Sequence, residues 1–560
     1  MRITTSYQLV IRNCFPVMIF LAVGMTSCKT MSHEISETDQ ESFDKALQNA
    51  ELANEGFIRC NNYMNAWLSF ADPESKLVPR TLDQDKDIWN ANDCAADNFP
   101  FLVLTSFFTD PEKYKGVMSE MLNNEIRLTS RVKSLPDTYS FSKKGFFYDS
   151  LSMPRVIFGT TEYIKDGLLP ITEWLGATPW SERMLTMLND LDEHIDVAGG
   201  FGKNTFGMAP EDEVNGELLQ ILSRVYWMTG EEKYLSWAIQ IGEHFVNDAF
   251  PLDSHYLRLR DHGCEIVSGL CELYVALNYA DPERKAYFQE PVHMLLDYIL
   301  REGRNNDGLF YNAINPKTDE VVDQNLADTW GYTLNGFYSA YMVDSTEAYL
   351  QAVTTVFSNL HKYHNHNWEN LGADGYADAI EGALNLYNRV PDERASRWID
   401  AEISVMWSMQ DSAHRANAQQ WRNTGIIEGW YGDGNFARTT IMYNLWKSKG
   451  TYLQPWSQDV KLGAERKGDT LFISIQSRTP WKGTLYFDKV RHSANMKLPV
   501  DWPRINQFPE WFTAVPANIY EFIDVGNATA DKVSGKALMD GVALTLKANE
   551  TKRLMVVSRK

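Results

Sequence analysis

Acidic side chains recur at one end of the predicted buried helices, and these residues are the best suited to chemistry. A pair of carboxyls can hydrolyse a glycosidic bond, because a protonated carboxyl gives its proton to the leaving oxygen while an ionised one activates water or attacks carbon. Asp328 and Glu265 form the leading pair, and Asp378 and Glu213 are the substitutes. A lone Asp at a helix start is more often an N-cap. Glu265 lies three residues beyond His262 on a face that is otherwise buried, which a cap does not explain.

Aromatic and basic side chains near the same helix ends are candidates for binding a sugar. The chain contains 17 Trp, 26 Tyr and 27 Phe, and flat rings suit the apolar faces of sugars, although they also fill a large helical core. Arg258, Arg260 and Arg438 are candidates to hold the carboxylate of an acidic sugar. The predicted substrate-binding residues are His262, Trp330, Tyr332, Trp430, Tyr431, Arg438 and Asp93.

Charge and motifs narrow the classes of partner. A formal net charge of −21 would be repelled by nucleic acid and by an anionic membrane face, so we expect neither as a partner. An acidic polysaccharide or oligosaccharide is compatible with this charge if local arginines hold its carboxylates. The sequence has no Walker loop, HExxH, GxSxG or EF-hand-like loop, and its six cysteines lack metal-ligand spacing. We therefore predict no cofactor and no metal.

Two kinds of helix-length segment alternate from about residue 41 to residue 450. The first kind is rich in small and aromatic residues and is predicted to be buried: 93–108, 160–175, 213–228, 265–279, 329–342, 376–387 and 427–446. The second kind is amphipathic: 111–132, 180–194, 231–247, 282–301, 346–362 and 394–409. This alternation predicts a mainly α fold, an (α/α)6 or (α/α)7 toroid, with an open α-solenoid as the alternative.

The loops indicate where a site would lie in such a ring. Short turns with Asp, Pro or Gly lead into the amphipathic helices, as at Asp110-Pro111 and Asp281-Pro282, whereas long Gly-rich loops such as 425–434 lead into the buried ones. Every buried helix then runs the same way, and their N-terminal ends share one rim. Helix N-termini favour anions, so we expect the candidate carboxylates to converge there.

The two ends of the chain differ from its helical body. Residues 1–28 resemble a lipoprotein signal peptide that ends at Met25-Thr26-Ser27-Cys28, and 29–40 form a polar tether. We expect an exported protein, in the periplasm or outer membrane, that touches a membrane only through lipid on Cys28. Period-two patterning after Trp456 predicts a β-sandwich over 451–560, with a last hairpin around Asn549-Glu550 and an aromatic loop, 502–512, docked on the helices.

The lipobox, the predicted toroid, helix ends such as Leu326-Ala327-Asp328-Thr329-Trp330-Gly331-Tyr332 and the terminal β-domain together resemble the six-hairpin glycosidases and related lyases of Bacteroidetes-type bacteria. Within that group the chain is most similar to glycoside hydrolase family 154. The resemblance implies a β-glucuronidase-like hydrolase that acts on uronic-acid-containing glycans. It covers nearly the whole mature chain as an architecture, without a family-defining motif matched residue by residue.

Two other functions fit the same sequence. A toroid polysaccharide lyase would use His262 or Tyr332 as the base that removes a proton from a uronate, while Arg or Asn neutralises its carboxylate. Elimination would produce an unsaturated uronate, whereas hydrolysis produces only a reducing end. A non-catalytic glycan-binding lipoprotein would have aromatic platforms without paired carboxylates.

Overall fold

The computed structural model describes residues 36–194, 208–412 and 420–558. The predicted leader and Cys28 lie outside these ranges, as do residues 195–207, which include Gly199, Gly200 and Gly202. Helix α1 begins at Glu37, where the Ser36 hydroxyl accepts a hydrogen bond from Asp39 N at 3.2 Å. The last residues of the predicted tether therefore form the first turn of α1. Within the described ranges, no helix is both long enough and apolar enough to cross a membrane.

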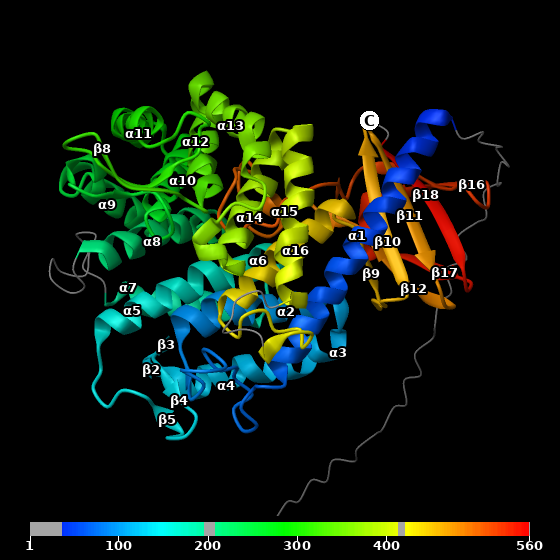
Figure 1. The fold of residues 1–560 in the computed structure, drawn as a ribbon, viewed down its shortest axis with the longest axis horizontal. Helices are drawn as coiled ribbons and strands as arrows, with labels where there is room; N and C mark the ends of the chain where they lie inside the picture. The colour runs from blue at the N-terminus through cyan, green and yellow to red at the C-terminus, as the bar shows by residue number, and fades with distance from the viewer. Residues whose placement is uncertain (1–35, 195–207, 413–419, 559–560) are drawn as a thin grey trace, which may run out of the picture.

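The helical body is a closed ring of buried helices (Figure 1). In chain order its inner members are η1 (Ala91–Asn98) with α2 (Phe99–Thr109), the run of α5 (Met153–Glu162), η3 (Tyr163–Leu168) and α6 (Leu169–Leu175), then α8 (Met208–Thr229), α10 (Cys264–Ala280), α12 (Trp330–Asp344), α14 (Ala373–Arg389) and α16 (Gly432–Lys447). Each member packs on the next, and α16 packs on η1 and α2. This closure distinguishes the fold from an open solenoid.

Amphipathic helices surround this ring. They are α1 (Glu37–Leu68), α3 (Pro111–Lys113), η2 (Tyr114–Met118), α4 (Ser119–Thr129), α7 (Pro179–Asp192), α9 (Glu232–Asn247), α11 (Pro282–Glu302), α13 (Glu347–Asn359) and α15 (Glu393–Ser412). Their first turns are capped as the sequence predicts: Asp110 and Asp281 each accept a backbone N–H at 3.1 Å, and Thr178 forms a capping box with Ser181. Short 3-10 turns, η4 (Pro251–Asp253), η5 (Leu360–Tyr363) and η6 (Trp368–Leu371), lie in the connections.

Glycines allow the inner helices to approach closely. A Cβ on Gly331 of α12 would lie 2.4 Å from Gly382 Cα of α14. We expect Gly331→Ala to destabilise the protein by about 1–3 kcal/mol in urea unfolding, because a backbone clash outweighs the gain of about 1 kcal/mol in helix propensity. Gly116→Ala is the control, since an added Cβ there meets nothing within 4 Å. Equal stability of Gly331→Ala and the wild type would contradict this packing.

The strands after residue 451 form two sheets that share one core. One sheet has the order β10 (Val460–Lys467), β11 (Thr470–Ser477), β18 (Glu550–Ser558), β15 (Ile519–Asp524) and β16 (Thr529–Ser534); the other has the order β17 (Val542–Leu546), β12 (Trp481–Tyr486) and β9 (Tyr452–Gln454). The predicted hairpin of β17 with β18 is wrong. The turn at Asn549 carries the chain from one sheet to the other, so β17 pairs with β12 and β18 with β11 and β15.

Helix α1 joins the two parts of the molecule, because it packs on α16 and also on β10 and β11 (Figure 1). Smaller elements complete the fold. They are the sheet of β1 (Ile88–Trp89), β4 (Tyr139–Ser140) and β5 (Gly145–Phe146), the pair β2 (Ser130–Val132) and β3 (Leu135–Pro136), the sheet of β6 (Leu257–Arg258), β7 (Tyr311–Asn315) and β8 (Glu320–Leu326), the pair β13 (Asp488–Lys489) and β14 (Thr513–Ala514), and helices α17 (Arg491–Ala494) and α18 (Gly535–Asp540).

The aromatic segment 502–512 docks on the helices, and it enters the ring from the C-terminal side of the inner helices. Trp502 Nε1 donates to Glu272 of α10 at 2.9 Å, and the Arg504 guanidinium donates to Glu173 of α6 at 3.1 Å. Asn506 N donates to Glu381 of α14 at 2.6 Å. Residues 502–512 belong to the orange segment seen among the inner helices in Figure 1. It blocks the axis of the ring at that end.

Arg224 of α8 holds this junction together. Its guanidinium donates to Glu272 at 2.6 and 2.8 Å and to Glu173 at 3.3 Å, and all three side chains are buried. We expect Arg224→Met to lower the free energy of unfolding by about 3–5 kcal/mol, because two buried carboxylates lose a shared cation. The control is Arg397→Met, whose exposed pair with Glu393 should be worth less than about 1 kcal/mol. Equal losses would show that the buried network does not stabilise the junction.

Candidate functional site

A cavity of about 150 Å³ lies on the axis of the ring. It is walled by residues near the N-terminal ends of α8, α10, α12, α14 and α16, by η1, and by the run from α5 to η3, as expected for the shared rim. Ile505 and Asn506 form its floor. The cavity is therefore blind. Its acidic lining residues are Asp93, Asp97, Glu162, Asp166, Glu213, Glu217, Asp261, Glu265, Glu369, Asp374 and Asp378.

Two inner segments are π-helical where they border the cavity. Segment η1 supplies Asp93 and Asp97, and η3 supplies Lys165 and Asp166. A π turn inserts an extra residue into a helix, which redirects the side chains around it and is frequent at functional sites. The outer π turn η2 lines no part of this cavity, so a π turn alone does not mark a site.

Glu265 lines the cavity, but both of its oxygens are occupied. Oε1 accepts from Lys165 Nζ at 2.7 Å, and Oε2 accepts from Gln220 Nε2. Burial raises the pKa of Glu265 against the opposing charge of Lys165. Burial alone would lower the pKa of Lys165, but Asp166 and Glu265 outweigh it and hold that pKa well above its usual value. This geometry fits a structural ion pair better than an acid or a base in a reaction.

Asp328 does not line the cavity. It is 4% exposed, and its Oδ1 accepts from Thr329 N at 2.9 Å. Burial, then the neighbouring Asp378 and Asp261, raise its pKa well above the usual range. Asp328 is therefore a buried group behind the wall, and the structure does not bring the leading pair of Asp328 and Glu265 together in the cavity.

Asp378, a substitute in the sequence-based ranking, has the geometry of an ionised carboxylate. Its Oδ1 accepts from the Tyr332 hydroxyl at 2.9 Å and from the Arg438 guanidinium at 2.5 Å. Both contacts favour the charged form. They fall on one oxygen, and Oδ2 has no hydrogen-bond partner among the described residues. Asp378 lines the cavity with that oxygen unoccupied.

Glu381 completes this group. Its Oε2 accepts from the Tyr332 hydroxyl at 2.9 Å, and its Oε1 accepts from Asn506 N. Burial raises the pKa of Glu381 to about 7 although Arg438 opposes the shift. Arg438 also donates to the Asn506 amide oxygen at 2.8 Å. The loop from the β-domain therefore fixes the cation that holds Asp378.

Glu369 was missed by the sequence analysis. It lies in η6 with φ 37°, and the next residues, Asn370 and Leu371, also have positive φ. Such strain often accompanies a functional position. Glu369 lines the cavity, and one oxygen accepts from Arg260 at 3.1 Å. Burial, followed by the carboxylates of Asp328, Asp261 and Asp378, raises its pKa to about 8 although Arg260 opposes the shift. Glu369 is thus protonated at neutral pH.

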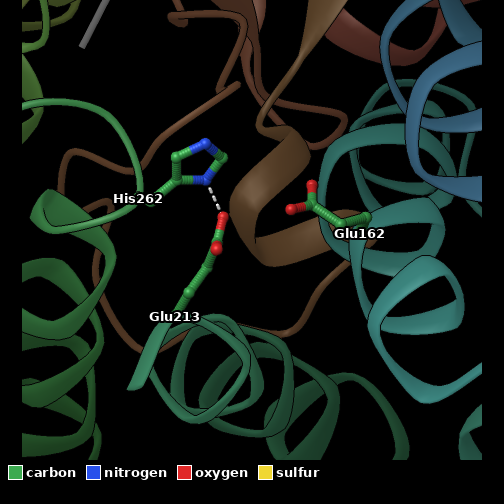
Figure 2. Close-up of side chains that lie close together, drawn as sticks. All are labelled: Glu162, Glu213 and His262. Carbon is green, nitrogen blue, oxygen red and sulfur yellow. Dashed lines mark hydrogen bonds and ion pairs between the residues drawn. The ribbon is translucent and has the colours of Figure 1, made fainter. Parts of the chain in front are cut away.

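Glu162, Glu213 and His262 meet on another wall of the cavity (Figure 2). His262 Nδ1 contacts Glu213 Oε1, and its Nε2 lies 3.0 Å from Asp261 Oδ2. Burial and then the charge of Lys165 lower the pKa of His262 to about 4, so its imidazole is neutral. Burial, with Glu217 and Asp166 nearby, raises the pKa of Glu162 well above its usual range.

The remaining predicted binding residues have different fates. Trp330 is fully buried and packs edge-on against Trp398, so as a sugar platform it is corrected to a core residue. Tyr431 lines the cavity and its ring lies 5.2 Å from that of Trp430. Asp93 lines the cavity and accepts from Arg80, which also lies 6.0 Å from both of these rings.

Several lining carboxyls could have been found from spacing. Glu162 and Asp166, and likewise Glu213 and Glu217, are four residues apart and so share one helix face. Glu369 and Asp261 lie in irregular segments, where the spacing of residues along the sequence does not predict which side chains share a face. Among the described residues, the lining contains two cations, Lys165 and Arg438, and both are ion-paired. Burial raises the pKa values of Asp97, Glu217 and Asp374 well above their usual range.

Comparison with known proteins gives only distant likenesses. No family model and no curated protein matches the chain. The solved structures similar to it include a family 76 glycoside hydrolase (mannosidase) from Bacteroides thetaiotaomicron, at 12% identity over 70% of this chain and 98% of that one, with a TM-score of 0.37. An α-1,2-mannosidase from Trichoderma reesei has 12% identity, covers 75% and 98%, and has a TM-score of 0.42. The unsaturated glucuronyl hydrolase of Bacillus sp. GL1 has 13% identity, covers 53% and 87%, and has a TM-score of 0.35. TM-scores below 0.5 assign neither family nor activity to this chain.

Proposed function

We propose that the chain is a carbohydrate-active enzyme, a glycoside hydrolase that cleaves one sugar from a chain end in the blind cavity. Glu369 is the proton donor, and Asp378 is the ionised carboxylate that activates water or attacks the anomeric carbon. One observation supports this most: two carboxyls line one cavity in contrasting surroundings, Glu369 facing other carboxylates and Asp378 in contact with an arginine and a tyrosine hydroxyl. Burial keeps the proton on Glu369, whereas Tyr332 and Arg438 favour the charge on Asp378.

The shape of the cavity supports cleavage at a chain end. Ile505 and Asn506 close the floor, so a polysaccharide cannot pass through the ring. Tyr431 lines the wall, and an aromatic side chain can contact the apolar face of a terminal sugar.

The cavity fits a neutral sugar better than a uronate. Arg438 and Lys165 are the cations among the described lining residues, and each already contacts two carboxylates. Arg260, predicted to hold a uronate, donates to Glu369 at 3.1 Å and is not among the residues that line the cavity. A uronic-acid substrate would have to displace one of these partners, and a neutral sugar would not. The acidic polysaccharide of the sequence analysis therefore stays a prediction, with a neutral glycan as the substrate that the geometry favours.

The lyase alternative has weaker support from the same geometry. The Tyr332 hydroxyl, which has one proton to donate, lies 2.9 Å from an oxygen of Asp378 and 2.9 Å from an oxygen of Glu381. Burial raises the pKa of Tyr332 well above the usual value, so it is a poor base at neutral pH. His262 is neutral and can accept a proton, but the described lining supplies no unpaired cation to neutralise a uronate carboxylate. Elimination needs both groups.

A product assay decides among these functions. The purified chain is incubated with neutral oligosaccharides and with uronate-containing ones, and reducing ends and the ultraviolet absorbance of unsaturated uronates are followed. We expect reducing ends, released one sugar at a time, without that absorbance. Growth of the absorbance would show a lyase, and binding without any product would show a glycan-binding lipoprotein.

Three finer assignments belong to the same proposal. The inner ring, read from η1 to α16 along the described chain, supports an (α/α)7 rather than an (α/α)6 count. Membership of glycoside hydrolase family 154 rests on the resemblance of sequence and architecture alone. Export as a lipoprotein anchored at Cys28, in the periplasm or outer membrane, rests on residues 1–28.

A further inference from the structure

Glu162, Glu213 and His262 come from three separate elements and present a compact set of donor atoms. Glu162 ends α5, Glu213 lies in the second turn of α8, and His262 precedes α10. One oxygen of each carboxylate and one ring nitrogen all lie within 4.8 Å of one another. In Figure 2 Glu213 and His262 point toward each other, and the Glu162 carboxylate faces them from the neighbouring helix. Donors at this separation can contact a common ion without rearrangement of the backbone.

Glu217 provides an independent sign that a ligand belongs here. Its side chain lines the cavity one helical turn after Glu213, it is 1% exposed, and among the described residues its Oε2 has no hydrogen-bond partner. Glu217 also forms a second set with Glu162 and Asp166, again with one donor atom of each within 4.8 Å of the others. A buried carboxylate oxygen without a partner is costly unless a proton or a cation satisfies it.

The nearby cation does not fill this position. Lys165 Nζ contacts Asp166 at 2.8 Å and Glu265 at 2.7 Å. No contact of Lys165 with Glu162 or Glu213 is present among the described residues. Glu162 and Glu213 therefore lie in the same cavity as a lysine that is engaged elsewhere.

We propose that Glu162, Glu213 and His262 bind one divalent transition-metal cation of the Mn²⁺ to Zn²⁺ class, next to Glu217. Two carboxylate oxygens and one imidazole nitrogen suit these ions, whereas Ca²⁺ takes oxygen ligands. Three protein ligands leave coordination positions for water or for sugar hydroxyls in the cavity. The proposed metal site differs from the prediction of no metal, which followed from the absence of short metal-binding motifs in the sequence. The three ligands are 49 or more positions apart in pairs, so no short motif contains them.

Metal binding is measured directly, without any turnover, so its failure is separate from failure of the proposed hydrolysis. The full chain is freed of metal with EDTA, dialysed, and titrated with MnCl₂ and with ZnCl₂ by calorimetry, with Mn²⁺ also followed by electron paramagnetic resonance. We expect one ion per chain. His262→Gln and Glu213→Gln should each weaken binding by at least about tenfold, because each removes a ligand.

A matched control separates this site from other histidines. His364 forms a pair with Glu402, with Nδ1 and Oε1 2.6 Å apart, and His364→Gln should leave the affinity unchanged. The His262 side chain is 41% exposed, so His262→Gln is expected to fold, and its circular dichroism should match that of the wild type. If His262→Gln were nevertheless unfolded, Glu162→Gln would test the same site.

Two results would overturn the proposal. One is the absence of saturable binding of either ion to the wild type. The other is saturable binding that survives in His262→Gln and Glu213→Gln but is lost in His492→Gln. That pattern would place the ion at His492, Asp501 and Glu510, the other described His-containing set with donor atoms within 4.8 Å.

Discussion

Asp378→Asn is expected to lower kcat by roughly 10³-fold or more, because the ionised carboxylate that activates water or attacks carbon is lost. The substitution keeps the size of the side chain, and its amide oxygen can still accept from Tyr332 and Arg438. Stability should therefore change little. Initial rates on the substrate found in the product assay, with thermal unfolding of the same preparation, measure the effect.

The chain offers a close control for this variant. Asp400 also accepts on Oδ1 from a tyrosine hydroxyl, that of Tyr443 at 2.7 Å, and from a cation, Lys447, at 2.7 Å, but it lies on the outer helix α15. Asp400→Asn should leave kcat within about twofold of wild type, as expected for a site away from the chemistry. Full activity of Asp378→Asn would contradict its role. A loss in Asp328→Asn as large as in Asp378→Asn would instead support the carboxylate ranked first from sequence.

Glu369→Gln is expected to lower kcat by roughly 10²- to 10⁴-fold on substrates with a poor leaving group, since the proton donor is removed. The loss should be much smaller on an aryl glycoside whose leaving group needs no proton. Glu55→Gln is the control, because Glu55 also pairs with an arginine, Arg59 at 2.8 Å, but on the outer helix α1. Equal losses on both kinds of substrate would contradict a role as the acid.

Glu369 is also expected to determine how kcat falls at alkaline pH. Burial and the facing carboxylates of Asp328, Asp261 and Asp378 raise the pKa of Glu369 to about 8, and Arg260 opposes them. Because the donor must be protonated, kcat should be retained below that pH and should fall as pH rises through about 8. Glu369→Gln should abolish this limb. A wild-type profile that stays flat to about pH 10, well beyond the pKa range in question, would show that Glu369 is not the donor.

Packing geometry explains why the ring could be predicted from the sequence. Segments rich in small and aromatic residues, such as 265–279, alternate with amphipathic segments, such as 282–301, and this alternation indicates which helices are buried. Capping residues such as Asp281 indicate where the amphipathic helices begin. Convergence of acidic residues at one rim then follows from helix direction.

The ranking of individual carboxylates could not be predicted in the same way. Asp328 precedes α12 and Asp378 lies in the second turn of α14, and only the tertiary structure shows that the first lies behind the wall and the second lines the cavity. The position of Glu369 is set by a strained segment whose sequence shows no regular spacing of apolar residues. Trp330 has the composition expected of a sugar platform but faces Trp398. The prediction of a hairpin between β17 and β18 was wrong because the alternation of apolar and polar residues identifies strands but does not identify the strands with which they pair.

The sequence predicted only part of the contribution that the C-terminal region makes to the cavity. Docking of the aromatic loop was expected, but the position of Asn506 was not. Its backbone N–H binds Glu381, and its side chain binds Asp166 and Arg438. The β-domain therefore supplies part of the floor and orients the arginine that holds Asp378.

The most direct test is a crystal structure of Asp378→Asn with the oligosaccharide identified by the product assay. We predict that the terminal sugar occupies the axial cavity, with its glycosidic oxygen within hydrogen-bonding distance of Glu369 and its anomeric carbon facing residue 378. A sugar bound only outside the ring, with the cavity holding water alone, would contradict the account.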